Sequence, residues 1–456
     1  MVLLVLDVPL FWDNVLLGGK LPTWYFNHGG LANLYPPEEI AGYPPLFGLY
    51  ISQMWLWFGR SLTVTHLSML PFLWGISLQV IFLVRRFMAR RVLVMASVVM
   101  LCLPVLLSLQ CQCGPDILFI FIYLFCLNKI LDRQRLLLLL GLCILPLISP
   151  RAGISLFSLF IIDQILLGHR VFAFRWPWAF GKGLTFLPAA ILLVAWYWGQ
   201  NYTYGWWVTN PHGAWAGMAK GVGPITYVYN LFIAGYRMVD FGQMAVFISL
   251  IVVVVGLFRR QRKPHEFRPA LIVLFLVPAV VFGLTFSLFQ NPIGHRYMVI
   301  PVLFALLWLL FEWSEFYSYK VFFVRCSVFF CIFMLGQVMI SLYPKSVAKG
   351  WDGSLAHIAA GRGRWSVVEF AHRRQIPLHS IGATYPNLDA VDASFLNGDT
   401  SHFAELNLVD NNYVLITNAS NDYPNMLERY LEEKGTEVFS TEIWPVYYKV
   451  YRLPTE

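Results

Sequence analysis

Long apolar stretches separated by short polar segments form the main pattern of this chain. A membrane-spanning helix needs about 20 mainly apolar residues, so stretches of this length and kind predict a bundle of membrane helices. Some stretches are short for a full crossing, and the total we expect is about ten or eleven helices. The expected helices cover residues 64–84, 92–109, 117–131, 136–148, 152–168, 184–198, 243–258, 270–289, 298–314 and 321–342.

Composition supports the same conclusion. The chain is 58% hydrophobic and 13% charged, whereas soluble domains carry about 25% charged residues. The sequence therefore predicts a multi-pass integral membrane protein. The net charge of +8 does not indicate nucleic-acid binding, because the basic residues sit in short clusters between apolar runs.

The basic clusters fall in alternate loops, and an excess of Lys and Arg marks the cytoplasmic side of a membrane protein. These clusters are Arg85, Arg86, Arg90 and Arg91; Lys129, Arg133 and Arg135; Arg170, Arg175 and Lys182; and Arg259, Arg260, Arg262, Lys263 and Arg268. The other loops, beginning with a first external loop at residues 7–63, are then external. In a bacterial inner membrane that side is the periplasm. Residues 1–6 are too short to span, and we expect them to end a helix that begins upstream.

The composition becomes soluble-like after Tyr343. We therefore expect two domains, a membrane domain at residues 1–342 and an external α/β domain at 343–456. Helices are expected at 365–375 and 426–434, strands at 377–384 and 413–418, and a final strand or hairpin at 436–453. The segment Gly361-Arg-Gly-Arg364 lacks the strand–loop–helix context of a phosphate-binding loop.

Aromatic residues crowd the external segment 199–242. They predict either an interfacial belt, with or without a short helix lying on the membrane surface, or a platform for a sugar. The residues are Trp206, Trp207, Trp215, Tyr227, Tyr229 and Tyr236. The seven cysteines form no disulfide pattern, and Cys111 and Cys113 lack the second ligand pair of a metal site.

Two aspartates precede apolar or helical runs on the external side. Asp13 follows an apolar, aromatic segment, and a partly desolvated carboxylate there could act as a base that deprotonates an acceptor hydroxyl or amine. The simpler alternative is that Asp13 caps a helix at residues 15–21. Asp116 either caps the helix that follows or joins Asp13 in binding the acceptor or a divalent metal ion.

Cations on the external side are informative because they oppose the usual charge bias. Arg151, His295 and Arg296 lie on that side. The planar guanidinium fork of arginine matches a phosphate group, which needs such a partner as negative charge develops on it. The alternative is that these residues bind ordinary phospholipid headgroups or neighbouring carboxylates.

Four short motifs occur in an order that resembles the GT-C membrane glycosyltransferases. They are Pro9-Leu-Phe-Trp-Asp13-Asn14, Tyr43-Pro-Pro-Leu46, Gly114-Pro-Asp116 and His295-Arg-Tyr297. The nearest branch resembles the dolichyl-phosphate-mannose protein mannosyltransferases and the bacterial aminoarabinose transferases, over about residues 1–300. Some bacterial members of that branch also carry an external C-terminal domain.

This resemblance implies a polyprenyl-phosphate sugar donor and transfer of the sugar with inversion. It makes Asp13 the candidate base, with Asp116 and Asp7 as further acids and with Trp12, Tyr43 and Tyr297 lining the substrate. Asn14 replaces the family's second acid, which weakens a metal-binding role. Tyr43 replaces a His or Lys, so Lys20, His28 or Arg151 is expected to contact the donor phosphate, together with His295 and Arg296.

The sequence thus predicts an integral-membrane glycosyltransferase that moves a sugar from a polyprenyl-phosphate donor to a protein, lipid or glycan. The alternatives are a transporter or flippase of a lipid-linked glycan, and a non-catalytic membrane scaffold. No cofactor is assigned, and a divalent metal stays open. The enzyme hypothesis requires Asp13, Asp116 and the His295-Arg296 pair to lie within roughly 15 Å of one another.

Overall fold

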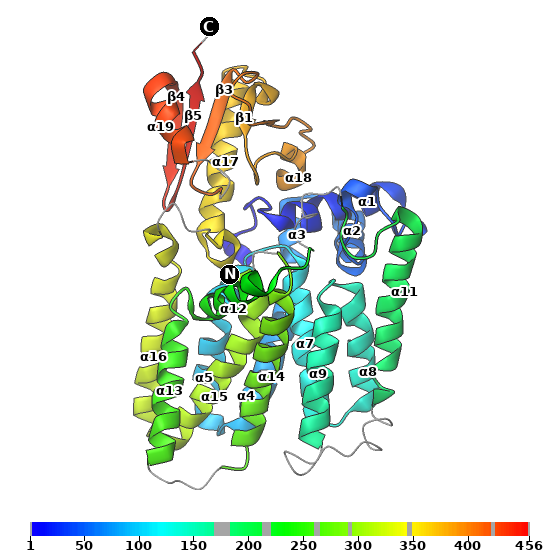
Figure 1. The fold of residues 1–456 in the computed structure, drawn as a ribbon, viewed down its shortest axis with the longest axis vertical. Helices are drawn as coiled ribbons and strands as arrows, with labels where there is room; N and C mark the ends of the chain where they lie inside the picture. Colours follow the sequence, from blue (N-terminus) through cyan, green and yellow to red (C-terminus); the bar gives the residue numbers. More distant parts are fainter. Residues whose placement is uncertain are drawn as a thin grey trace.

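The computed structural model describes residues 2–167, 183–211, 220–259, 265–290, 294–343, 349–420 and 425–454. A helical bundle forms most of the molecule, and a small sheet with its own helices sits at one end of it (Figure 1). The expected fold class, a mainly helical membrane bundle with a small C-terminal α/β unit, is confirmed.

Each expected apolar stretch contains a helix. The bundle helices are α3 (Leu62–Leu67), α4 (Leu70–Phe87), α5 (Leu93–Leu101), α6 (Pro104–Leu109), α7 (Pro115–Leu131), α8 (Arg135–Ile144), α9 (Ala152–Leu167), α11 (Leu187–Tyr204), α13 (Met244–Arg259), α14 (Arg268–Ser287), α15 (Val299–Phe316) and α16 (Tyr319–Gly336). Pro104 separates α5 from α6 because proline lacks the backbone donor that a continuous helix needs.

Helix α15 is the centre of the bundle, since its side chains from Val299 to Trp313 are buried. The outer helices expose large apolar side chains, as lipid-facing helices do; Trp74 is 71% exposed. By length and composition, four helices in the described ranges can cross a membrane alone: Leu62–Phe87, Arg268–Ser287, His295–Phe316 and Tyr319–Gly336. The pair Pro224–Val239 and Met244–Leu257, bent by 91°, adds a fifth if it forms one span.

The first external segment differs from the expected polar loop, because much of it is helical. It contains a short π-helix η2 (Val15–Lys20), α1 (Leu21–His28) and α2 (Leu46–Phe58), which lie across one end of the bundle (Figure 1). Helix α2 buries Phe47, Ile51 and Trp55 on one face. These helices are short, and even the 13 residues of α2 fall below the about 20 that a spanning helix needs, so they were not among the expected membrane helices.

The aromatic-rich external segment contains α12 (Pro224–Val239), which lies nearly perpendicular to α13 at the same end of the bundle (Figure 1). Ile225 and Phe232 on this helix are exposed, while Asn230, Ala234 and Arg237 are buried. This geometry agrees with the alternative of a helix on the membrane surface. Trp215 and the basic residues Arg170, Arg175, Lys182, Arg260, Arg262 and Lys263 lie outside the described residues.

The C-terminal unit is a five-stranded sheet in the order β2-β1-β3-β5-β4. Strand β1 is parallel to β2 and β3, and β5 is antiparallel to β3 and β4. The elements are α17 (Ala356–Arg373), β1 (Ile381–Ala383), α18 (Val391–Phe395), β2 (Ala404–Glu405), β3 (Tyr413–Thr417), α19 (Asn425–Lys434), β4 (Thr436–Ile443) and β5 (Val446–Arg452). The helices and strands expected here are all present, while α18 and β2 were not expected.

Helix α17 connects this unit to the start of the chain. It packs on β4 and β5 on one side and against residues 9–12 on the other. A Cβ atom at Gly361 would lie 2.7 Å from Cγ of Pro9, so only glycine allows this approach. The C-terminal unit is thereby held directly above the segment that contains Asp13.

Candidate active site at the sheet-facing end of the bundle

Asp13 is the first residue of the site, and it does not cap a helix. The turn into it is sharp, because Trp12 has a φ of 57°. The next helix begins at Val15 with Asn14 as its N-cap. Asp13 is 9% exposed. Its Oδ2 accepts a hydrogen bond from Nη2 of Arg296, and its Oδ1 accepts one from the Tyr385 hydroxyl at 3.2 Å. The capping alternative for Asp13 is therefore wrong.

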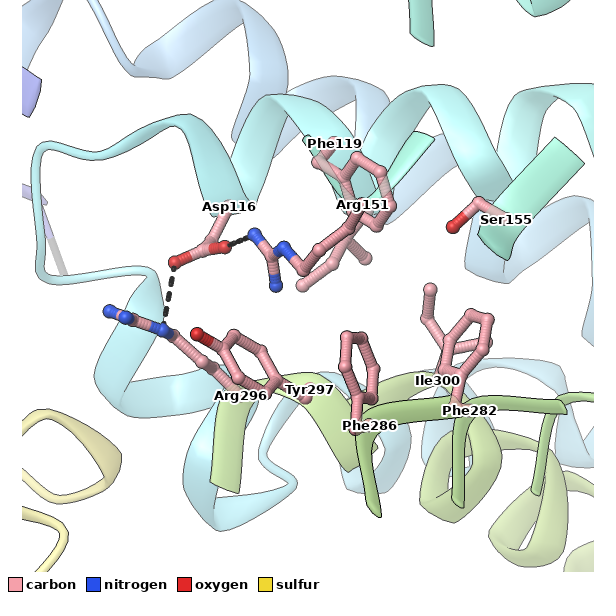
Figure 2. Close-up of a pocket in the computed structure, with 10 residues that line it drawn as sticks. Asp116, Phe119, Arg151, Ser155, Phe282, Phe286, Arg296, Tyr297 and Ile300 are labelled. Carbon is pink, nitrogen blue, oxygen red and sulfur yellow. Dashed lines mark hydrogen bonds and ion pairs between the residues drawn. The ribbon is translucent and has the colours of Figure 1, made fainter. Parts of the chain in front are cut away.

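Asp116 approaches the same arginine from α7. It lies in the first turn of that helix, after the N-cap Gly114. Its Oδ1 accepts a hydrogen bond from Nη2 of Arg151, and its Oδ2 lies 3.7 Å from Nε of Arg296 (Figure 2). The ion pair with Arg151, rather than a cap, occupies this carboxylate.

Arg296 is shared between three carboxylates. Besides Asp13 and Asp116, its Nη1 lies 3.2 Å from Oδ2 of Asp352. All three carboxylate side chains are at most 12% exposed in these ion pairs. With Arg151, the cluster holds three acids and two guanidinium groups. None of these acids binds Arg296 through both of its carboxylate oxygens. A ligand could therefore replace one acid at Arg296 while the other acids stay in place.

A pocket begins at these charges and continues between apolar side chains. Asp116, Arg151, Arg296 and Tyr297 line its charged end (Figure 2). The other lining residues, with one hydroxyl among them, are Phe119, Ile120, Ser155, Phe282, Phe286 and Ile300. The guanidinium carbon of Arg151 lies 4.9 Å from the ring centres of both Phe119 and Tyr297. Such a pocket suits a ligand with an anionic head and a hydrocarbon tail.

Two tyrosines outside the bundle helices approach the cluster. Burial, with added repulsion from Tyr297 and Asp13, raises the pKa of Tyr43 above its ordinary value. Burial and then the Asp13 charge raise the pKa of Tyr385 well above its ordinary value. Both phenols therefore remain protonated at neutral pH. Tyr385 serves as a neutral hydrogen-bond donor to Asp13, and the Trp12 ring packs edge-on against it at 5.0 Å.

Two of the predicted site residues, Asp7 and Lys20, lie elsewhere. Asp7 is exposed and pairs with Arg362 at 3.9 Å. Lys20 pairs with Asp389 of the C-terminal unit. In these contacts Asp7 and Lys20 pair with residues outside the cluster around Arg296.

His295 is next to Arg296 in sequence, but its ring turns to a second buried network. Its Nε2 lies 2.6 Å from Oδ2 of Asp240 and 3.3 Å from Nη1 of Arg237. The Tyr343 hydroxyl donates a hydrogen bond to the other oxygen of Asp240. Within these contacts His295 supports the turn that carries Arg296 rather than joining the three carboxylates.

Asp352 and Tyr385 are the site residues that the sequence did not indicate. Each belongs to the segment after residue 343, far along the chain from Asp13. The one local signal was Asn14, which stands where the sequence resemblance predicted a second acid. Its Nδ2 donates to Oε1 of Gln112 at 2.8 Å, and Nε2 of Gln112 donates to the Asp352 carbonyl at 2.6 Å. Asn14 is therefore tied to Gln112. Among the described residues, no group of three or more His, Cys, Asp or Glu side chains is arranged to hold a metal ion.

The fold of this chain is similar to that of ArnT. Two solved structures of ArnT from Cupriavidus metallidurans share it. The apo structure has a TM-score of 0.52 at 11% identity, over 98% of this chain and 96% of that chain. The structure bound to undecaprenyl phosphate has a TM-score of 0.50 at 15% identity, over 82% and 71%. No protein-family model matches the chain, and no curated protein matches it either.

Proposed function

We propose that this chain is an integral-membrane glycosyltransferase that takes a sugar from a polyprenyl-phosphate donor. The observation that carries the proposal is the shared Arg296. It joins Asp13 to Asp116 at the charged end of a pocket whose walls are otherwise mainly apolar. The likeness to ArnT, one structure of which holds undecaprenyl phosphate, supports the same class of donor.

The donor phosphate would lie between Arg151 and Arg296, and the first prenyl units would follow the apolar walls. Arginine is suited to this position because its fork gives two hydrogen bonds to a phosphate. The two guanidinium groups are already buried and oriented by Asp116 and by the Tyr297 ring. Little reorganisation is therefore needed when negative charge develops on the leaving group.

Asp13 would act as the base. When the donor phosphate binds Arg296 in place of Asp13, Oδ2 of Asp13 is free to accept a proton from the acceptor hydroxyl or amine. The acceptor oxygen or nitrogen then attacks the anomeric carbon, and the bond from that carbon to the phosphate oxygen breaks. The polyprenyl phosphate leaves with the bonding electron pair, its charge balanced by Arg151 and Arg296. A single displacement of this kind inverts the anomeric centre.

The site would face the outside of the cell, which in a bacterium is the periplasmic side of the inner membrane. Helix α13 ends and α14 begins at the bundle end opposite the sheet (Figure 1). Arg259 and Arg268 stand at those two helix ends, and basic residues mark the cytoplasmic side. Residues 1–342 then form the membrane-embedded catalytic domain, and residues 343–456 form an external domain that completes it with Asp352 and Tyr385.

Mass spectrometry of lipid that copurifies with the protein tests the proposal. We expect a polyprenyl phosphate, with or without a sugar, in the wild type and much less of it in Arg151→Ala. The control is Arg362→Ala, which removes an exposed cation outside the pocket and should retain the lipid. Equal amounts of ordinary phospholipid alone in all three proteins would contradict the proposed donor.

A further inference from the structure

The buried imidazole of His295 lies beside the proposed donor site without contacting its three acids. The residue is 1% exposed, and it begins the 3₁₀ turn His295–Met298 directly before the central helix α15. Its Nε2 donates to Oδ2 of Asp240 at 2.6 Å, because a carboxylate can only accept. A hydrogen bond to an ionised acceptor is short and strong, so this bond fixes the plane of the ring.

Asp240 is itself held by two further donors. It is 5% exposed and forms the C-cap of α12. Its Oδ1 accepts hydrogen bonds from the backbone N–H of Phe241 at 2.8 Å and from the Tyr343 hydroxyl. The Phe241 ring also packs on the imidazole of His295, with the ring centres 4.6 Å apart. The end of α12 and Tyr343 together therefore set the position of the imidazole.

The Nδ1 side of the imidazole carries the chain segment 350–353. A Cβ atom at Gly350 would lie 2.2 Å from Nδ1 of His295, and one at Gly353 would lie 3.3 Å from Cβ of His295. Only glycine allows the backbone to approach the ring so closely. Among the described residues Nδ1 has no hydrogen-bond partner, so the segment is held against the ring by packing.

Asp352 lies in this segment, between the two glycines. It belongs to the short 3₁₀ turn Trp351–Gly353. Its carbonyl accepts from Oγ of Ser108 at 2.8 Å and from Nε2 of Gln112 at 2.6 Å, and its carboxylate lies 3.2 Å from Nη1 of Arg296. The same imidazole thus precedes Arg296 in the chain and supports the turn that carries Asp352. Both ends of the Arg296–Asp352 ion pair depend on the position of one ring.

This ion pair gains importance when the donor binds, a step that rests on the proposed function. Arg296 uses Nη2 for Asp13 and Nη1 for Asp352. When the donor phosphate replaces Asp13 at Nη2, the contact with Asp352 remains and keeps the guanidinium plane in place. The third acid, Asp116, lies 3.7 Å from Nε and is also bound to Arg151, so it constrains that plane less.

We propose that His295, fixed by Asp240, is a positioning residue that orients Arg296 and Asp352 for transfer of the sugar. It touches neither donor nor acceptor, and it acts through the plane of the Arg296 fork. Donors that stabilise a developing charge do so because they are already oriented. A displacement of about 1 Å caused by a change far from the reacting atoms can lower turnover about 100-fold.

Gly350→Ala tests the packing on the ring, because its methyl group must push the segment 350–353 away from the imidazole while every polar group stays present. We expect kcat for transfer from a polyprenyl-phosphate sugar, measured per folded molecule in nanodiscs, to fall about tenfold to 100-fold. The matched control is Gly256→Ala on α13, where a Cβ atom would meet nothing within 4 Å; it should keep wild-type turnover. Wild-type turnover in Gly350→Ala as well would overturn the proposal.

The Asp352→Asn background separates positioning from general damage to the fold. Residues that act through one another have non-additive effects. Gly350→Ala acts through Asp352, so it should lower kcat little further once Asp352→Asn is present. The same fold-loss in both backgrounds would show a merely structural role and contradict the proposal.

Two substitutions of His295 keep the test decisive if Gly350→Ala does not fold. His295→Phe keeps a flat ring beside the glycines but cannot donate to Asp240, whereas the amide of His295→Gln can. We expect kcat to fall about tenfold or more in His295→Phe, and to be partly retained in His295→Gln. The opposite order, or wild-type turnover in both variants, would refute a positioning role for the His295–Asp240 bond.

The failure of this proposal is distinguishable from that of the proposed function. Wild-type protein that transfers no sugar would contradict the proposed function, and the unfolding midpoints of wild type, Gly350→Ala, Asp352→Asn and the double variant then decide on the link between His295 and Asp352. Gly350→Ala should lower the midpoint less in the Asp352→Asn background, because the ion pair that it disturbs is already absent. Equal losses in both backgrounds would show that no such link exists.

Discussion

Two partly buried arginines at opposite ends of the bundle show how differently one side chain can be used. Arg268, at the end far from the sheet, forms a closed pair with Glu312. Its Nε and Nη2 donate to the two carboxylate oxygens at 2.7 and 3.0 Å, and Trp308 adds a third bond at 3.0 Å. Arg296, at the sheet-facing end, divides its donors between Asp13, Asp116 and Asp352.

The difference lies in what a ligand could displace. Entry of an anion at Arg268 would break two hydrogen bonds and leave Glu312, which is 0% exposed, unpaired. At Arg296 an anion could replace one of three acids while the other two keep the guanidinium in place. The Arg268–Glu312 pair holds two helices together. Arg296, which is shared between three acids beside a pocket, can instead bind an anionic substrate.

The largest expected effect is at Asp13. Asp13→Asn removes the proposed base with almost no change in shape, so transfer from a polyprenyl-phosphate sugar should fall about 10²- to 10⁴-fold. The measurement is turnover by the purified, reconstituted variant, after its thermal unfolding shows an intact fold. Full activity in Asp13→Asn would end the assignment of Asp13 as the base.

Arg296→Lys should have the next largest effect. Lysine keeps the positive charge but lacks the planar fork that spans the acids and the phosphate. We expect kcat/KM for the donor to fall about tenfold to 100-fold, corresponding to about 1.4–2.8 kcal/mol, with part of the loss in kcat because Arg296 balances the charge that develops on the leaving phosphate. Steady-state kinetics against donor concentration give both parameters. An unchanged kcat/KM for the donor would remove Arg296 from the phosphate site.

Tyr385→Phe should reduce turnover about tenfold, because it removes one hydrogen bond to a charged carboxylate, worth about 1.5–3 kcal/mol. Burial and Asp13 hold the pKa of Tyr385 well above its ordinary value, so the phenol loses its proton only at a pH above that ordinary value. The pH–rate profiles of wild type and Tyr385→Phe should therefore share the same alkaline side up to about pH 10. An alkaline loss of activity that is present in wild type and absent in the variant would show that this phenol ionises.

Arg268→Gln should have the smallest effect on turnover and a large one on stability. It leaves Glu312 buried and unpaired, so the free energy of unfolding should fall by about 3–5 kcal/mol. Activity per folded molecule should stay at the wild-type level. The double variant Arg268→Gln/Glu312→Gln removes both charges and should recover part of the stability. If Arg268→Gln loses turnover as steeply as Arg296→Lys while still folded, the distinction between the two arginines fails.

Much of the fold follows from the sequence pattern, because membrane helices and the strands of the C-terminal unit carry strong local signals. The helices predicted at residues 298–314 and 426–434 agree closely with α15 and α19. Between Val15 and Phe58 the sequence offered a helix only at residues 15–21, as the alternative for Asp13. Helix α2 is apolar along most of its length, but its 13 residues fall short of the about 20 that a spanning helix needs, so it was not among the expected membrane helices.

The site was predictable only where its residues sit in motifs. Asp13, Asp116 and Arg296 were found because they occur in order on one side of the bundle, and the structure joins them. Asp7 and Lys20 were placed with them through proximity in sequence, but the chain turns sharply at Trp12 and carries them to the C-terminal unit. Asp352 and Tyr385 reach Asp13 only because α17 packs against residues 9–12, and no local pattern encodes that contact.

The most direct test of the account follows both halves of the donor. Wild-type protein is reconstituted in liposomes with a polyprenyl-phosphate sugar labelled in the sugar and in the phosphate, and native membranes supply the acceptor. We predict that sugar leaves the lipid and that free polyprenyl phosphate appears in equal amount, with neither change in Asp13→Asn. Movement of the intact lipid-linked sugar across the bilayer, without separation of the two labels, would contradict the account and show a flippase instead.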